Sequence, residues 1–187
     1  MNAWMFLCAA VLLSLERICY LWIWRAPDAF RVWYKHLGVP FFIDRLIGSR
    51  DPVDGLRLLF YGFKGLQCAV FLAWCFICGN GALLPLSGSL LSFSLGAVLI
   101  VAGQIVNVSV FYRLGKVGAF YGERFGYEVP WCRKFPFSWF RHPQYTGALL
   151  SIWGFFLVMR FPHDDWCMLP ALEMVYYVLG AYLERSN

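Results

Sequence analysis

Charged residues are scarce in this chain: they make up 14% of its 187 residues, against 60% apolar and 20% aromatic residues. A soluble domain averages about 25% charged and about 45–50% apolar residues. With a mean hydropathy of +0.59, a water-soluble fold would expose more apolar surface than it could hide without a partner or a bilayer. The composition therefore excludes a disordered chain, a collagen and a soluble multidomain enzyme.

The chain also lacks the cysteine pattern of a disulfide framework or a metal site. Its seven cysteines are an odd number, and most lie in or beside apolar runs rather than in a turn-rich secreted pattern. Cys75 and Cys78 form a C-x-x-C inside an apolar run, with no second pair and no nearby His. That context is typical of packing rather than of zinc binding, so we expect no metal site.

Five apolar stretches are long enough, or nearly so, to cross a membrane as helices. They are 3–24, 58–78, 90–111, 146–161 and 166–183. The fourth is short, the first contains Glu16 and Arg17, and the last two form a hairpin. The first lacks the basic start and the cleavage site of a signal peptide, so we expect it to be retained. The predicted fold is an all-α transmembrane bundle of about five helices in a single domain, 1–187.

The distribution of Lys and Arg predicts the orientation of this bundle. Connectors 25–57 and 112–142 are rich in both residues, whereas 79–89 and 162–165 contain neither. The basic connectors should face the cytosol, which places the N-terminus outside and the end of the last helix inside. The net charge of +5 then reflects topology and anionic membrane lipid, and we expect no nucleic-acid partner.

Connector 25–57 contains aromatic and apolar residues at helical spacing, opposite Arg31 and Lys35. This pattern predicts an amphipathic helix lying in the membrane interface after the first span. The alternative is a plain cytosolic loop with scattered aromatics. The residues that form the apolar face are Phe30, Trp33, Tyr34, Leu37 and Phe41.

Polar residues gather where connector 112–142 enters the fourth span, and Arg141 and His142 stand at its start. Pro143 suits the first position of a helix, and the free amides of the next three residues would favour an anion. We expect a carboxylate or phosphate there. The alternative is that Arg141 snorkels, His142 caps the helix and Tyr145 belongs to an interfacial aromatic belt.

The hairpin should bring Glu184, at the end of the fifth span, back to the same level. There its carboxylate could pair with Arg141 or accept two hydroxyls from a ribose. The alternative is an exposed ion pair of little energetic weight. Gly103 and Gly147 would permit close approach of a backbone or a ligand.

Three motifs resemble one known family. They are L-G-x-x-G-x-F-x-G-E-x-F-G over 114–126, F-P-F over 135–137 and R-H-P-Q-Y-T-G over 141–147. In residue type and spacing they resemble the phosphatidylethanolamine and phospholipid N-methyltransferases, within the small integral-membrane methyltransferases. The last motif is shared with prenylcysteine carboxyl methyltransferases. The resemblance covers nearly the whole chain and is strongest over 103–184.

The resemblance implies an S-adenosylmethionine cofactor at the membrane–cytosol interface, held by a Gly-x-Gly in the third span and by paired acids after the last. This sequence departs from both patterns, with Val101-Ala102-Gly103 at the first and Leu183-Glu184 at the second. For the cofactor, Arg141 and His142 would bind the carboxylate, and Glu184 the ribose. Tyr145 would face the sulfonium, close to Gly147.

Glu123 matches an acidic position of the phospholipid enzymes. It is the candidate catalytic residue, binding the cationic headgroup and accepting the proton that the amine must lose before methylation. The alternative is an interfacial ion pair with Arg124 or Lys116.

The implied function is methylation of phosphatidylethanolamine, or of its mono- and dimethyl forms, toward phosphatidylcholine. The alternatives are a prenylcysteine carboxyl O-methyltransferase, an NADPH-dependent sterol reductase and a non-catalytic membrane scaffold. The run 118–126 argues against the first; Gln144 in place of Asn, and no acid after Gly147, argue against the second. We expect a multi-pass membrane protein with its active site facing the cytosol, in the endoplasmic reticulum of a eukaryote or the inner membrane of a bacterium.

Overall fold

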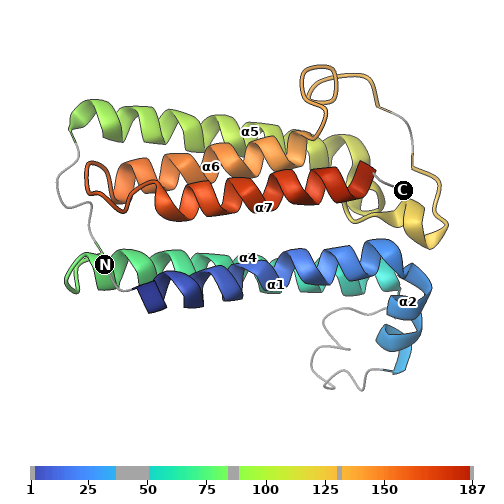
Figure 1. Ribbon diagram of the computed structural model, residues 1–187. Coiled ribbons are helices and arrows are strands. Elements are labelled where there is room, and N and C mark those ends of the chain that lie inside the picture. Colours follow the sequence, from blue (N-terminus) through green and yellow to red (C-terminus); the bar gives the residue numbers. More distant parts are fainter. Residues whose placement is uncertain (1–2, 37–50, 84–88, 130–131, 186–187) are drawn as a thin grey trace.

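The computed structural model describes residues 3–36, 51–83, 89–129 and 132–185, and their regular structure is helical. The elements are α1 (Ala3–Arg25), α2 (Pro27–His36), α4 (Pro52–Cys78), α5 (Leu90–Ala119), the short 3-10 helix η1 (Gly122–Phe125), α6 (Pro143–Met159) and α7 (Met168–Arg185). Helices α1 and α4 lie side by side in one layer, and α5, α6 and α7 form a second layer beside them (Figure 1). The expected all-α bundle is confirmed.

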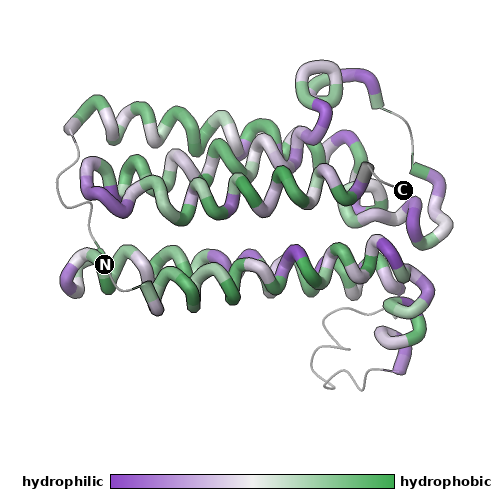
Figure 2. The backbone as a smooth tube through the Cα atoms, in the orientation of Figure 1, coloured by the Kyte–Doolittle hydropathy of each residue, from purple (hydrophilic) through white to green (hydrophobic). Residues whose placement is uncertain are grey.

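Apolar side chains cover the outward faces of the long helices. Leu90 is 81% exposed, Val98 62% and Trp4 78%, and hydrophobic residues dominate the helices of both layers (Figure 2). Three segments are long and apolar enough to cross a membrane, judged by length and composition: Ala3–Arg25, Pro52–Cys78 and Leu90–Phe125. Helices α6 and α7, with 17 and 18 residues, are shorter. The first three predicted spans thus correspond to helices of membrane-spanning length.

Two buried clusters hold the layers together. The larger one joins α1, α4, α6 and α7, and its members are Ala9, Leu13, Val70, Phe71, Trp74, Cys75, Ile152, Phe156, Leu169 and Tyr177. The second joins the ends of α1 and α4 to α2 and to the segment around η1, through Ile23, Phe30, Tyr34, Val53, Leu56, Ala119, Phe120 and Phe125. The second cluster holds α2 and η1 in place, and both lie within the connectors that are rich in Lys and Arg.

Helix α2 lies within connector 25–57, where the sequence predicts an amphipathic helix in the membrane interface. Phe30 is fully buried and Tyr34 is 7% exposed, whereas Trp33 is 42% exposed. Leu37 and Phe41, the other two members of the expected face, lie outside the described residues. Part of the aromatic face of α2 therefore packs in the protein core.

Helix α5 runs past the expected end of the third span at 111 and continues to Ala119. Gly115 interrupts it with φ 62° and ψ −170°, a backbone conformation that glycine adopts without a side-chain clash. The glycine-rich run that starts at 114 therefore begins as a bent helix end rather than as a loop.

Helices α5 and α6 touch backbone to backbone along a line of glycines. A Cβ on Gly96 would lie 2.7 Å from the carbonyl oxygen of Gly154, and a Cβ on Gly154 would lie 2.5 Å from that of Gly96. Seven residues further along each helix, or about two turns, Gly103 and Gly147 form the equivalent contact. A Cβ on Gly147 would lie 2.8 Å from the carbonyl oxygen of Gly103. Small residues allow this close packing, which is a common way for membrane helices to associate.

Replacing one of these glycines should separate the two helices. We expect Gly154→Ala to lower the free energy of unfolding by about 1–3 kcal/mol, the usual cost of overpacking a tight contact. Gly65→Ala in α4 is the matched control, because nothing lies within 4 Å of its added methyl, and it should be neutral or slightly stabilising. Thermal unfolding in detergent measures both, and equal stability of the two variants would contradict the packing described.

Hydrogen bonds among Trp74, Arg160 and Asp165 join the C-terminal end of α4 to the loop between α6 and α7. Arg160 is 3% exposed and donates to Asp165 through Nε at 2.9 Å and Nη2 at 2.6 Å. Trp74 Nε1 also donates to Asp165 at 2.9 Å. Burial disfavours the charged form of Asp165, but the hydrogen bonds from Arg160 and Trp74 outweigh it and hold its pKa below the usual value.

Because the pKa of Asp165 is lowered by folding, its contribution to stability is present above the unfolded pKa of about 3.9 and is lost as the pH falls through the lower folded value. We expect Asp165→Asn to cost about 3 kcal/mol at pH 7, since it leaves a buried guanidinium without its counter-ion. The neighbouring Asp164→Asn, on an exposed residue, is the control. Thermal unfolding against pH should show the wild type converging on Asp165→Asn below about pH 4; a constant difference would contradict the linkage.

Candidate functional site

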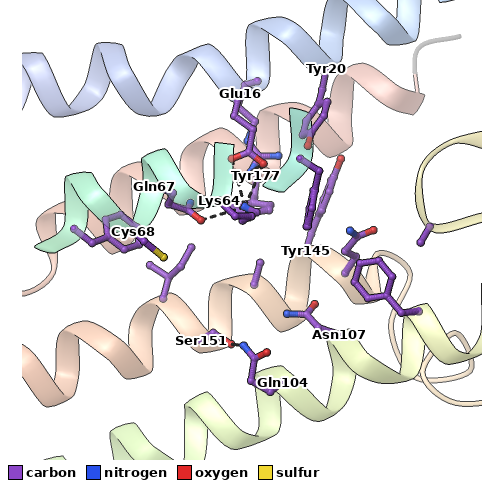
Figure 3. A pocket seen from close by; sticks show the side chains of 18 of the residues that line it. Glu16, Tyr20, Lys64, Gln67, Cys68, Gln104, Asn107, Tyr145, Ser151 and Tyr177 are labelled. Atoms are coloured by element: carbon purple, nitrogen blue, oxygen red, sulfur yellow. Dashed lines mark hydrogen bonds and ion pairs between the residues drawn. The ribbon is translucent and has the colours of Figure 1, made fainter. Parts of the chain in front are cut away.

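A cavity of about 600 Å³ lies between the two helical layers. Its wall is mostly apolar and aromatic, with a few polar side chains from α1, α4, α5 and α6 (Figure 3). Cavities of this size and lining are typical of small-molecule and lipid sites. Tyr121 and Tyr145 form part of its wall, and both also contact Glu184.

Glu184 contacts two tyrosines, Tyr145 in the first turn of α6 and Tyr121 just before η1. Tyr121 donates to Glu184 Oε1 at 2.9 Å, and the Tyr145 hydroxyl donates to the same oxygen. The two hydroxyls lie 3.3 Å apart. The antiparallel hairpin of α6 and α7 produces this contact, because the last turn of α7 returns to the first turn of α6. The sequence offered Arg141 or a ribose diol as the partner of Glu184, and the contacts in the structure come from the two tyrosines.

The start of α6 agrees with the sequence in part. Pro143 occupies the first helical turn and His142 is the N-cap residue, and the His142 ring stacks on Tyr145 with 5.8 Å between ring centroids. The expectation of three free amides is wrong for Thr146, whose N–H donates to the His142 carbonyl at 3.0 Å. That bond is the first helical hydrogen bond of α6, so only the amides of Gln144 and Tyr145 precede it.

The structure brings His142, Tyr145 and Glu184 together but leaves Arg141 exposed. Leu183, the neighbour of Glu184, is half-buried.

Val101, Ala102 and Gly103 lie on α5, outside the cavity wall described. Val101 is 58% exposed on an outward face, and Ala102 is half-buried. Gly103 is buried against α6, where a Cβ would lie 2.5 Å from the carbonyl oxygen of Gly147. Gly103 and Gly147 thus set the distance between α5 and α6.

Glu123 is an exposed residue of η1. The two cations considered as its partners are engaged elsewhere. Lys116 forms an ion pair with Asp54 at 2.9 Å, and the Arg124 guanidinium lies 3.5 Å from the centroid of the Trp24 ring. Those contacts leave the ion-pair interpretation of Glu123 without support from either cation.

Sequence reasoning missed a buried polar network beside the cavity. Lys64 Nζ lies 3.2 Å from Glu16 Oε1 and donates to Gln67 at 3.1 Å and to the Tyr177 hydroxyl at 3.2 Å. Gln67 in turn donates to Glu173 Oε1 at 2.6 Å. Figure 3 shows Glu16, Lys64, Gln67 and Tyr177 converging between the layers. Charged residues inside apolar spans are a functional signal in themselves, and that rule would have found Lys64 and Glu173.

Comparison with known proteins places the chain in a family. Residues 91–186 match the family model described as phospholipid methyltransferase, so the chain belongs to the phospholipid methyltransferase family. The matched region contains all but the first residue of α5, together with η1, α6 and α7, and hence Tyr121, Tyr145 and Glu184. Together with its three long apolar helices, this family makes the chain a membrane protein.

A curated relative supports the same family. Over 54 residues the chain is 44% identical to a protein of Arabidopsis thaliana named phosphatidyl-N-methylethanolamine N-methyltransferase. The match covers 29% of this chain and 33% of that protein. No solved structure matches the chain.

Proposed function

We propose that this protein is an S-adenosylmethionine-dependent N-methyltransferase acting on the amine headgroup of phosphatidylethanolamine and of its mono- and dimethyl forms, toward phosphatidylcholine. The observation that carries the proposal is the meeting of His142, Tyr145 and Glu184 beside a cavity of about 600 Å³, within the residues that match the family model. The name of the Arabidopsis relative supports the same chemistry.

The side chains at the start of α6 fit the proposed cofactor. When bound, S-adenosylmethionine supplies a methyl group on a cationic sulfur. The Tyr145 ring, which packs against His142 and Tyr177, is the proposed neighbour of that cation, since aromatic rings favour cations. The amides of Gln144 and Tyr145 and the nearby Arg141 suit a carboxylate. Glu184 accepts hydrogen bonds from two hydroxyls in the structure, which is the chemistry that a ribose diol requires.

The remaining residues orient these groups and handle the proton. We assign Gly103 and Gly147 a positioning role, because their close contact sets where the first turn of α6 lies relative to α5. Val101 and Ala102 directly precede Gly103 on α5, and Leu183 directly precedes Glu184 on α7. Glu123, exposed on η1, is the proposed binder of the headgroup ammonium and acceptor of its proton. A mostly apolar cavity wall favours the neutral form of an amine, which is the form that methylation requires.

The proposed topology has five spans, with α6 and α7 crossing as a hairpin and α2 lying in the interface. The basic connectors then lie on the cytosolic side with the site. The protein would reside in the endoplasmic reticulum of a eukaryote or the inner membrane of a bacterium.

Methyl transfer tests the proposal directly. Full-length protein in lipid nanodiscs would receive methyl-labelled S-adenosylmethionine with phosphatidylethanolamine, its monomethyl form, its dimethyl form or farnesylcysteine. We expect label in one or more phospholipids. Label in the prenyl product alone would contradict the lipid assignment, and no binding of the cofactor would contradict methyltransferase activity altogether.

The cofactor site is tested by a binding measurement. We expect Glu184→Ala to raise the dissociation constant of S-adenosylmethionine about tenfold to a hundredfold, because hydrogen bonds to a charged group are lost. Equilibrium dialysis measures this, and Glu128→Ala, on an exposed residue, is the control. Unchanged affinity in Glu184→Ala would refute the assignment of Glu184 while leaving the family intact.

A further inference from the structure

Arg17 is a buried cation, and two of its guanidinium nitrogens have no hydrogen-bond partner in the protein. Its side chain is 14% exposed, and its Nε and Nη2 atoms are shielded from solvent without a hydrogen-bond partner. The nearest carboxylate oxygen, Glu16 Oε1, lies 3.8 Å from Nη2, beyond hydrogen-bond distance. A buried guanidinium in this state is costly unless something satisfies it.

Two of the charges near Arg17, Glu16 and Lys64, are paired with each other. Lys64 lies closer to Glu16 than Arg17 does, at 3.2 Å, and Gln67 occupies one oxygen of Glu173. The other oxygen of Glu173 is buried without a hydrogen-bond partner, and Glu173 is not among the residues that line the cavity. The cavity wall itself carries two cations, Arg17 and Lys64, and one carboxylate, Glu16.

Aromatic rings hold Arg17 at the cavity wall beside the candidate site. Its guanidinium carbon lies 3.8 Å from the centroid of the Tyr177 ring and 5.8 Å from that of Tyr145. The hydroxyl of Tyr20 and the amide oxygen of Asn107 line the same cavity and are also buried without partners. Stacking leaves the edge of a guanidinium, with its N–H groups, available to a ligand.

The geometry points to an oxyanion as the ligand of Arg17, and we propose that it is the phosphodiester of the phospholipid acceptor. Two N–H groups on one edge of a guanidinium match two oxygens of a phosphate. Arg17 stands eight residues before the end of α1 at Arg25, so it lies about 12 Å along the helix from the predicted cytosolic end. Apolar wall residues continue beyond it, among them Phe71, Ile152 and Phe155, and suit acyl chains. This inference rests on the proposed function.

The alternative source of an oxyanion is the carboxylate of the cofactor. That group already has a proposed place at the first turn of α6, whereas Arg17 comes from α1, outside the residues 91–186 that match the family model. Separate measurements of lipid and cofactor binding distinguish the two sources.

The test is a binding measurement that needs no methyl transfer. Short-chain phosphatidylcholine and a matched lipid with an uncharged linker in place of the phosphodiester are titrated into the full-length protein in detergent. The wild type should prefer the phosphodiester lipid by about tenfold or more, and Arg17→Gln should lose this preference. Arg25→Gln, on an exposed cation at the end of the same helix, should keep it. The dissociation constant of S-adenosylmethionine should be unchanged in Arg17→Gln.

Three results would overturn the proposal: a wild type without preference for the phosphodiester, an Arg17→Gln variant that keeps the preference, or a loss of cofactor affinity alone. If Arg17→Gln does not fold, Arg17→Lys retains the charge but not the two-pronged geometry, and an undiminished preference there counts against the proposal equally. Lipid binding is measured here without turnover. Failure to methylate any lipid would therefore contradict the proposed function but not the assignment of Arg17 to the phosphodiester.

Discussion

The glycine contact between α5 and α6 is the constraint on which the site depends. Because Gly96, Gly103, Gly147 and Gly154 have no side chains, the two helix backbones approach closely along their length. This contact fixes the first turn of α6 against α5, and the hairpin then brings the last turn of α7 to the same place. Tyr121, at the end of the α5 segment, and Tyr145 can therefore share Glu184 as acceptor.

The layer formed by α1 and α4 supplies the room and the charge that the closely packed α5 and α6 cannot. Helices α1 and α4 lie apart from α5, and the cavity fills the space between the layers (Figures 1 and 3). Its polar lining from this layer comes chiefly from Glu16, Arg17 and Lys64, which lie within otherwise apolar helices. Burying such charges in a membrane helix is expensive, and mutual pairing offsets the cost for Glu16 and Lys64 but only weakly for Arg17. The family motifs and this charged group therefore face one cavity from opposite layers.

Much of the fold was predictable because the bilayer imposes simple rules on sequence. The apolar stretches, the hairpin and the start of α6 at Pro143 follow from helix length and from the fixed φ of proline. The extension of α5 to Ala119 was not predictable, since Gly115 is a turn residue by composition and its place in a bent helix depends on neighbouring contacts. The sequence could not decide which residue contacts Glu184 either. Arg141 and Tyr145 both lie at the start of α6, and only side-chain packing selects the tyrosine.

The sequence by itself determined an all-helical membrane protein, its family motifs and the residues that surround the start of α6, because hydrophobic length and local spacing are written directly in the chain. Only the tertiary structure decided which of those residues meet, that Val101 faces outward while Gly103 packs on α6, and that Arg17 borders the same cavity as Tyr145. The physical reason is that these relations join helices far apart in sequence, and their rotation about their axes is set by packing across the whole bundle rather than by any local pattern.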